Sequence, residues 1–299
     1  MRVLVTGATG YIGSAVVREL AGAGHEVIGL ARSDASAKAL AEAGACVHRG
    51  SLDDLDSLRA GAAAADGVIH AAFTNVSPTT DFVAVCQADA AAITALGAGL
   101  AGSGKPLVVT SGTGLVHVQG RAATEDDPAN WGPRVAGEQA ALALAGQGVR
   151  VSIARLALSV HDGQADRRGF IPSLISLARE KGASAYIGDG ANRWTGVHRL
   201  DAAWLFRLAL EGAPAGARLD GVGDEGIPFR AIAGAIGAGL GLPVTSVGPE
   251  EAGAYFGYLA PFVAADNLSS SARTRALLGW KPGRPGLLED LEHGGYLPA

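Results

Sequence analysis

Three glycines near the start of the chain have the spacing of a phosphate-binding turn. Gly7, Gly10 and Gly13 follow the apolar run 1–5, typical of a buried strand, and precede a helical pattern that begins at Ser14. Such glycines permit a tight bend, close approach of the backbone to a pyrophosphate, and close helix–strand packing. The helix N-terminus adds free N–H groups and the positive end of its dipole. We favour a dinucleotide site over an ordinary glycine-rich turn, because strand, motif and helix occur in the required order.

The residues after the second predicted strand distinguish between the two nicotinamide dinucleotides. An acidic residue there bonds the ribose 2′-hydroxyl of NAD(H), whereas a basic residue accommodates the 2′-phosphate of NADP(H). The run here ends in Arg32 and Ser33 with no carboxylate before them, and guanidinium groups suit charge-assisted phosphate contacts. The sequence therefore favours NADP(H) over NAD(H). In the alternative interpretation, Arg32 is a solvated surface charge and Asp34 binds the hydroxyl.

Short apolar runs alternate with helical patterns through the first half of the chain. The predicted strands are 2–6, 26–30, 46–49, 67–70, 107–110 and 149–155. The predicted helices between them are 14–23, 35–43, 52–61, 82–103 and 134–146. Such alternation is typical of an α/β protein with a doubly wound parallel sheet, a Rossmann fold, covered by helices on both faces. Ligands of such sheets bind at the carboxyl ends of the strands.

The second half of the chain is less regular. Helices are predicted at 170–181, 229–240 and 286–292, and a short strand followed by a helix at 197–210. We therefore expect a dinucleotide-binding domain over 1–157 and a small, mainly substrate-binding lid over 158–299, with 190–212 packing back on the first domain. Trp194, Tyr186 and Phe170 are candidates for an apolar substrate pocket, although such aromatic residues more often form core.

Composition limits the class of protein. The 299 residues are 48% hydrophobic and 18% charged, with a net charge of −5. An acidic balance disfavours nucleic acid and anionic membrane surfaces as partners, and a small-molecule substrate is expected instead. We expect no apolar run of transmembrane length, no room for a signal peptide before the first strand, a cytoplasmic location and no metal site. The two cysteines, Cys46 and Cys86, are expected to be reduced core thiols.

Several segments resemble one enzyme superfamily. Thr6-Gly-Ala-Thr-Gly-Tyr-Ile-Gly13, Val108-Val-Thr-Ser-Gly-Thr113 and Val197-His-Arg-Leu-Asp-Ala-Ala203 occur in the order found in extended and atypical short-chain dehydrogenases/reductases, the NAD-dependent epimerase/dehydratase superfamily. The resemblance covers most of the chain. It implies a dehydrogenase-type scaffold and a homodimer formed through helices 82–103 and 134–146.

The same scaffold implies where a cofactor would lie. Beyond the three glycines, the expected binding residues are Thr9, Tyr11, Ile12, Arg32, Ser33, Ser51, Leu52, Ala71, Ala72, Phe73, Ser111, Arg134 and Leu156. Ser51 and Leu52 should lie by the adenine, and the small Ala71 and Ala72 should let the backbone approach a ribose. His70, just before them, is expected to be a core histidine.

The family's catalytic Tyr and Lys, four residues apart on a helix, are missing. None of the tyrosines has a Lys four positions later. In the family a Glu commonly follows that Lys by four positions; Glu138 fits, which places Arg134 at the Lys position and Asn130 at the Tyr position. Arg134 could bond a ribose as a fixed cation, but Asn130 cannot supply a proton. A register shift of one would bring in Trp131, and Arg134 could also be a plain surface residue.

Other groups could then assist catalysis. The resemblance places a Ser or Thr after the fifth strand, and we expect Ser111 and Thr113 to bond a substrate carbonyl, the alternative being local turn contacts. His117 and His161 are candidate proton donors because histidine titrates near neutrality. His198 is expected to be structural or substrate-facing.

Two functions remain in competition at this point. The first is an NADP(H)-dependent oxidoreductase that reduces a carbonyl-type group on a small, apolar substrate, with hydride supplied by the cofactor. The second is a non-redox protein on the same scaffold, either a cofactor-binding regulator or a lyase or isomerase, since fold alone does not establish activity. A sugar-nucleotide epimerase is a weaker third, because such enzymes usually need the missing Tyr.

Overall fold

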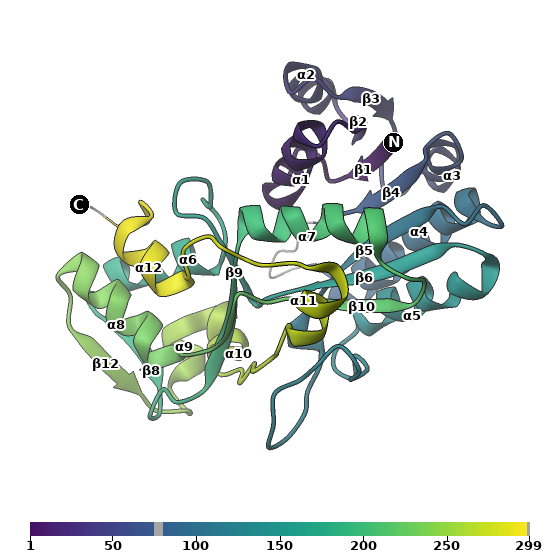
Figure 1. Cartoon of the computed structure of the whole chain (residues 1–299). Helices are drawn as coiled ribbons and strands as arrows, with labels where there is room; N and C mark the ends of the chain where they lie inside the picture. Colours follow the sequence, from purple (N-terminus) through teal and green to yellow (C-terminus); the bar gives the residue numbers. More distant parts are fainter. Residues whose placement is uncertain (75–79, 298–299) are drawn as a thin grey trace.

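The computed structural model describes residues 1–74 and 80–297, and its larger part is a doubly wound parallel sheet (Figure 1). Seven strands pair in the order β10-β6-β5-β4-β1-β2-β3, all parallel. Their bounds are β1 Arg2–Thr6, β2 Glu26–Ala31, β3 Cys46–Arg49, β4 Gly67–His70, β5 Pro106–Gly112, β6 Arg150–Leu156 and β10 Ala217–Gly221. In this order β1 has β2 on one side and β4 on the other, so the direction in which the chain adds strands reverses at β1. Ligands of such sheets bind at this point. The predicted α/β class is confirmed.

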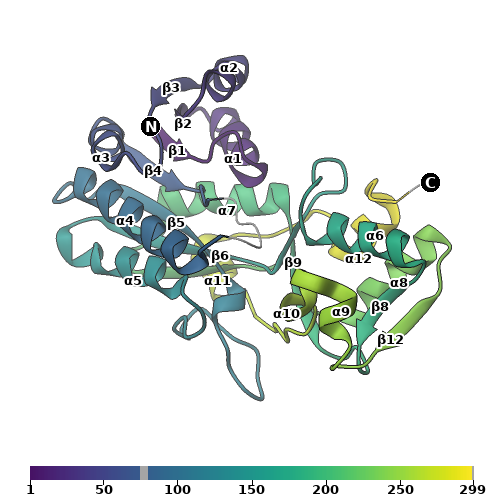
Figure 2. The same cartoon turned by 180° about the vertical axis from the view of Figure 1, so that it is seen from behind.

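Helices cover both faces of this sheet, as two separate apolar cores require. Helices α1 (Tyr11–Gly22), α2 (Asp34–Glu42) and α7 (Arg199–Gly212) enclose one core. Helices α3 (Leu55–Ala63), α4 (Phe82–Leu100) and α5 (Val135–Ala143) enclose the other, seen from the front in Figure 2. The central strands are buried on both faces, which explains their continuous apolar sequence.

A smaller lid lies beside the carboxyl edge of the sheet (Figures 1 and 2). It contains a three-stranded sheet in the order β11-β9-β7 and the pair β12-β8. The bounds are β7 Ser159–His161, α6 Phe170–Lys181, β8 Ser184–Ile187, β9 Arg193–His198, β11 Asp224–Pro228, α8 Phe229–Leu240, β12 Val244–Val247, α9 Ala252–Phe256, α10 Ala260–Val263 and α12 Leu287–His293. The last strand of the large sheet, β10, and helix α11 (Ala272–Leu278) against it come from this half of the chain.

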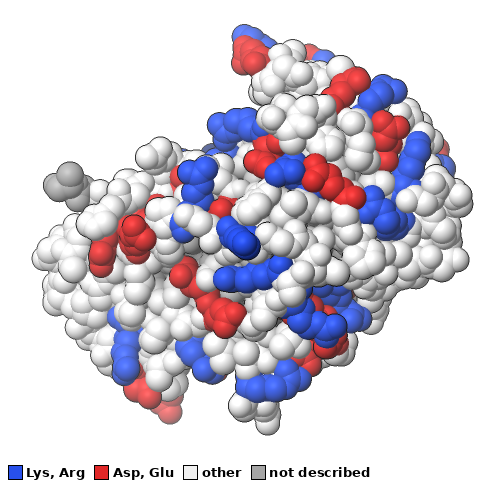
Figure 3. Space-filling model, viewed as in Figure 1, with Lys and Arg blue, Asp and Glu red and all other residues white. Residues whose placement is uncertain are grey.

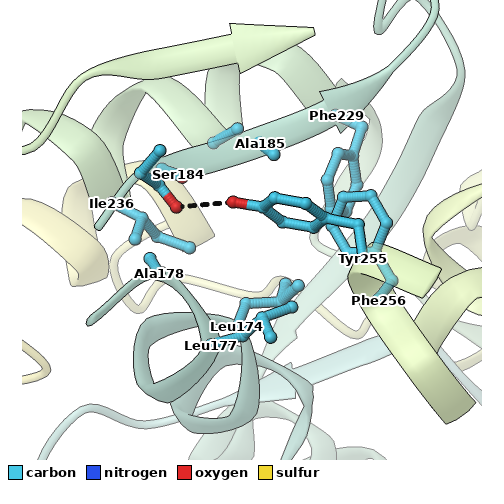
Figure 4. A pocket seen from close by; sticks show the side chains of 11 residues that line it. Leu174, Leu177, Ala178, Ser184, Ala185, Phe229, Ile236, Tyr255 and Phe256 are labelled. Carbon is cyan, nitrogen blue, oxygen red and sulfur yellow. Dashed lines mark hydrogen bonds between the residues drawn. The ribbon is translucent and has the colours of Figure 1, made fainter. Parts of the chain in front are cut away.

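The lid has a core of its own, built around aromatic residues. Trp194 is fully buried, meets Phe170 and Phe229 edge-on, and donates its indole N–H to the Phe262 carbonyl at 2.9 Å. A small cavity beside it is lined mainly by apolar side chains of α6, α8 and α9, and Tyr255 donates its hydroxyl to the Ala183 carbonyl there (Figure 4). Trp194 of the expected substrate pocket instead fills the lid core, and Phe170 and Tyr186 pack, partly buried, against that core.

Three further expectations need correction or refinement. The sequence missed β10, so residues 199–222 return to the large sheet, beyond the expected 190–212. Cys46 is exposed rather than core, because β3 is the edge strand, whereas Cys86 is buried; both thiols are free. Helix α4 has 19 residues with a mean hydropathy of 1.5, so the expectation of no apolar run of transmembrane length was wrong. Length and composition alone are weak evidence for a membrane-spanning helix. Helix α4 packs between α3 and α5, as a core helix does.

Candidate functional site

The glycine turn is built by contacts that only glycine allows. Gly7 has a φ of +68°, and a Cβ there would lie 2.8 Å from the Ala72 backbone. A Cβ on Gly13 would lie 2.0 Å from the Gly7 carbonyl oxygen, so strand and helix touch through this pair. Gly10 is the N-cap of α1, and no side chain caps that helix. The turn therefore leaves the N-terminal N–H groups of α1 without side-chain acceptors, as an anion site requires.

A chain of hydrogen bonds holds the end of β4 against this turn. His70 is buried; its Nδ1 lies 2.8 Å from Thr6 Oγ1, and its Nε2 lies 3.0 Å from Asp89 Oδ1. The Ala72 N–H donates to Thr6 Oγ1 at 3.3 Å. The core role expected for His70 is confirmed, and the backbone of the small Ala71 and Ala72 packs directly against Gly7.

The end of β2 carries an unpaired cation and a paired anion. Arg32 is exposed and makes no hydrogen bond or ion pair with any residue that the structure describes. Asp34, the first residue of α2, accepts a hydrogen bond at 2.6 Å from the guanidinium of Arg49, the last residue of β3. The hydroxyl of Ser33 caps α2 by accepting from the Ser36 N–H at 3.2 Å. The positive charge of Arg32 is thus free, while the carboxylate of Asp34 is neutralised.

The remaining residues expected at the cofactor lie along the same edge of the sheet. Thr9 is exposed in the turn, and Ile12 packs on the core beneath it. After β3, Ser51 accepts the Asp53 N–H at 3.3 Å, and Leu52 packs partly buried on the second core. Leu156 is buried at the end of β6, opposite Gly112 of β5. The parallel topology places every one of these positions at a strand's carboxyl end.

The guanidinium of Arg134 stacks on an aromatic ring beyond the carboxyl end of β4. Its guanidinium carbon lies 4.1 Å from the ring centre of Phe73, which follows β4. Burial lowers the pKa of Arg134, and the nearby carboxylate of Asp89 opposes that shift. Within the described residues Arg134 has no hydrogen-bond partner, so its donors remain available to a ligand.

The structure does not place Asn130 and Arg134 on one helical face, because α5 begins only at Val135. Asn130 is exposed and clamps the backbone of His117, donating Nδ2–H to its carbonyl and accepting its N–H at Oδ1, both at 2.9 Å. His117 is exposed and stacks on Trp131, with ring centres 5.0 Å apart. Asn130 therefore shapes a loop, and His117 is open to solvent at its surface.

The two hydroxyls expected to bind substrate are both engaged inside the protein. Ser111 donates to Glu138 Oε1 at 2.6 Å, and Glu138 in turn receives two hydrogen bonds from Arg155. Thr113 is fully buried and donates to Asn267 Oδ1 at 2.9 Å, with Thr195 Oγ1 3.2 Å away. Ser111 thus supports a buried ion pair, and Thr113, the residue after β5, ties the end of that strand to β9 of the lid.

His161 in the lid strand β7 and Tyr11 at the start of α1 are both held by hydrogen bonds. His161 is fully buried, with Nδ1 2.7 Å from Asp290 Oδ2 of α12, and its ring meets that of His198 edge-on. His198 caps α7 by accepting the Leu200 N–H at 3.2 Å, as its expected structural role predicts. The Tyr11 hydroxyl donates to the Val160 carbonyl at 3.4 Å, and burial raises its pKa, so it keeps its proton.

Sequence reasoning missed Arg199, which joins α7 to the glycine turn. Its guanidinium donates to the Tyr11 carbonyl and to Ser14 Oγ, and stacks over the Tyr11 ring. The signal was present, since Arg199 lies within the family-like segment that contains His198. Arg199 also lines a surface hollow between α1, α7 and the C-terminal segment, on a face where charges of both signs are interspersed (Figure 3).

Comparison with known proteins gives independent evidence on the family and the fold of this chain. The family model described as "NAD dependent epimerase/dehydratase family" matches residues 3–219. An uncharacterized protein of Schizosaccharomyces pombe is 48% identical over 298 residues, 99% of this chain and 100% of the relative. An uncharacterized protein of Saccharomyces cerevisiae is 44% identical over 296 residues, 97% and 98% of the two chains. The solved structure of a Streptomyces venezuelae dTDP-glucose 4,6-dehydratase double mutant, with NAD bound, is 21% identical with a TM-score of 0.79, covering 99% of this chain and 96% of the other.

Proposed function

The chain belongs to the NAD dependent epimerase/dehydratase family, and on this premise we propose that it is an NADP(H)-dependent oxidoreductase. The proposed reaction reduces a carbonyl-type group on a small, apolar substrate. One observation carries the cofactor part of the proposal: Gly7 and Gly13 touch backbone so closely that no other residue fits, and Gly10 leaves α1 without a side-chain cap. A turn of this construction binds a dinucleotide pyrophosphate.

The preference for NADP(H) rests on the charges at the end of β2. Arg32 is unpaired within the described residues, and Asp34 is already bound to Arg49. A 2′-phosphate would therefore meet a free guanidinium and no free carboxylate, which suits charge-assisted recognition. The related dehydratase structure contains NAD, so the preference for the phosphorylated form is a property that we assign to this chain's own residues.

The cofactor supplies the hydride, and the protein has to hold both partners and manage a proton. Arg134 is placed to bond the ribose, since its donors are free beside Phe73. His161 is enclosed and paired with Asp290, so we assign the proton to water or to the exposed His117.

Binding of the two dinucleotides tests this proposal directly. The purified protein would be titrated with NADPH and, separately, with NADH, and both dissociation constants measured at one ionic strength by calorimetry. We expect micromolar NADPH binding and markedly weaker NADH binding. Absence of binding of either would contradict the proposal, and equal binding would contradict the assigned preference.

A second function is favoured by the engagement of Ser111 and Thr113 and by the replacement of the family's Tyr. A non-redox protein, either a regulator or a lyase or isomerase, would bind the dinucleotide without net hydride transfer. Incubation of the protein and NADPH, deuterated at C4, with a panel of small carbonyl compounds separates the two. Stereospecific transfer of deuterium to a product supports the reductase and excludes a purely regulatory role.

The expected partners follow from the same proposal. We propose a small-molecule substrate, no nucleic-acid or membrane partner, and a homodimer through α4 and α5. Phe82 and Val83 at the start of α4 are exposed, 39% and 52%, and would be covered in such a dimer. Light scattering after size-exclusion chromatography tests it, and a variant with Val83→Glu should be monomeric.

A further inference from the structure

We infer that Arg49 sets the choice between the two nicotinamide dinucleotides by neutralising Asp34; this inference rests on the proposed function. Arg49 ends β3 and is the register partner of Ala31, which ends β2. Its guanidinium therefore lies at the corner of the sheet where Arg32 leaves β2 and Asp34 begins α2. The Arg49 Nη2 to Asp34 Oδ1 distance is 2.6 Å.

The role follows from adding the charges at this corner. Arg32, Arg49 and Asp34 together carry a net charge of +1. A phosphate monoester carries about −1.5 to −2 at pH 7, so this corner attracts the 2′-phosphate of NADPH. Without Arg49 the net charge falls to zero, and the carboxylate of Asp34 is released to repel a phosphate or to accept a hydrogen bond from a ribose hydroxyl.

The Arg49–Asp34 pair contributes little to the stability of the fold. Both side chains are largely exposed, 55% for Arg49 and 99% for Asp34, and ion pairs so exposed contribute little to folding. The chain offers a matched control, because Arg59 and Asp56 form another exposed pair at 2.6 Å on α3. A specificity role requires that only the pair at the end of β2 alters dinucleotide binding.

The test is a double-mutant cycle with binding as its readout. Variants Arg49→Gln, Asp34→Asn, the double variant, and the control Arg59→Gln would be titrated with NADPH, NADH and adenosine 2′,5′-bisphosphate at one ionic strength. We expect Arg49→Gln to lower the NADPH over NADH preference about tenfold and to weaken the bisphosphate in parallel. Adding Asp34→Asn should restore most of that loss, since the released carboxylate causes it.

The possible outcomes separate the role of Arg49 from dinucleotide binding itself. If the wild-type protein prefers NADPH but Arg49→Gln keeps the preference within twofold, the inference is wrong and the proposed function stands. If the double variant behaves like Arg49→Gln, the carboxylate is not the cause, and the inference is equally wrong. A wild-type protein that binds neither dinucleotide overturns the proposed function, and the role of Arg49 with it. Thermal denaturation of every variant shows that a loss of binding is not a loss of folding.

Discussion

Arg155 and Glu138 form a bidentate ion pair in the interior of the protein, with side chains 0% and 3% exposed. Arg155 Nε lies 2.9 Å from Glu138 Oε1, and Nη2 lies 2.8 Å from Oε2. The same Oε1 atom accepts the hydroxyl of Ser111 at 2.6 Å. Since β5, β6 and α5 each contribute one of these three residues, the pair fixes α5, and with it Arg134, against the sheet.

Removing one partner of this pair should destabilise the fold strongly. Glu138→Ala would remove the bidentate partner of the buried Arg155 guanidinium, whose other carboxylate neighbour, Asp220, lies 3.9 Å away; the expected loss is about 3 to 5 kcal/mol. Ser111→Ala removes one neutral donor and should cost about 1 to 2 kcal/mol. Urea unfolding of both variants measures the two values. If Ser111→Ala folded with unchanged stability but lost all turnover, Ser111 would be a catalytic residue rather than a support for the ion pair.

The glycine turn provides a sharp test of close packing. In Gly13→Ala the new Cβ would lie 2.0 Å from the Gly7 carbonyl oxygen, so the turn must distort. We expect NADPH binding to weaken at least 100-fold. The matched control is Gly22→Ala at the end of the same helix, where a Cβ meets no atom within 4 Å. This control should bind normally and gain about 0.5 to 1 kcal/mol in stability, because alanine favours helix.

Arg134 should act through its charge and its donors. We expect Arg134→Gln to weaken NADPH binding about tenfold, because a group free to bond the ribose is lost together with its contact to Phe73. Arg134→Lys should retain more of the affinity, as it keeps the cation. Arg18→Gln, an exposed arginine of α1 without a described hydrogen-bond partner, serves as the comparison. Equal affinities for all four proteins, measured by calorimetry, would remove Arg134 from the binding site.

Asp220 should make stability depend on pH. Burial raises its pKa from about 3.8 to about 7; the nearby Arg155 guanidinium lowers it and the Glu125 carboxylate adds to the rise. The folded protein therefore binds a proton between these values that the unfolded chain does not. The contribution of Asp220 to stability is fully present below pH 4 and lost as the pH rises to 7, about 4 kcal/mol at most.

The variant Asp220→Asn should remove this pH dependence. Its free energy of unfolding, measured in urea from pH 5 to pH 8, should fall less than that of the wild type. Asp53→Asn, an exposed carboxylate with no described side-chain hydrogen bond, should follow the wild-type curve. A parallel curve for Asp220→Asn would show that Asp220 is ionised throughout the range in the folded protein.

The sequence by itself determined the doubly wound fold and the glycine turn after its first strand. The alternation of short apolar runs and helices identified six strands of the seven-stranded sheet. The central strands must be apolar because they are buried on both faces, whereas the edge strand β3 is largely exposed. Gly7, Gly10 and Gly13 were identified by local spacing, since a tight turn and a close helix contact depend on neighbours in the chain. The strand β10 was not predicted, because the short run 217–221 joins the large sheet only after the chain has formed several elements of the lid.

Only the tertiary structure decided which polar groups are free to act. The sequence predicted catalytic roles for Ser111, Thr113 and His161. In the structure these side chains are hydrogen-bonded to Glu138, Asn267 and Asp290, respectively, which lie 27, 154 and 129 positions away in the sequence. The same holds for Asp34, whose carboxylate is neutralised by Arg49 of the neighbouring strand. Hydrogen bonds and charges depend on distance in space, and spacing along the chain does not report which side chains the fold brings together.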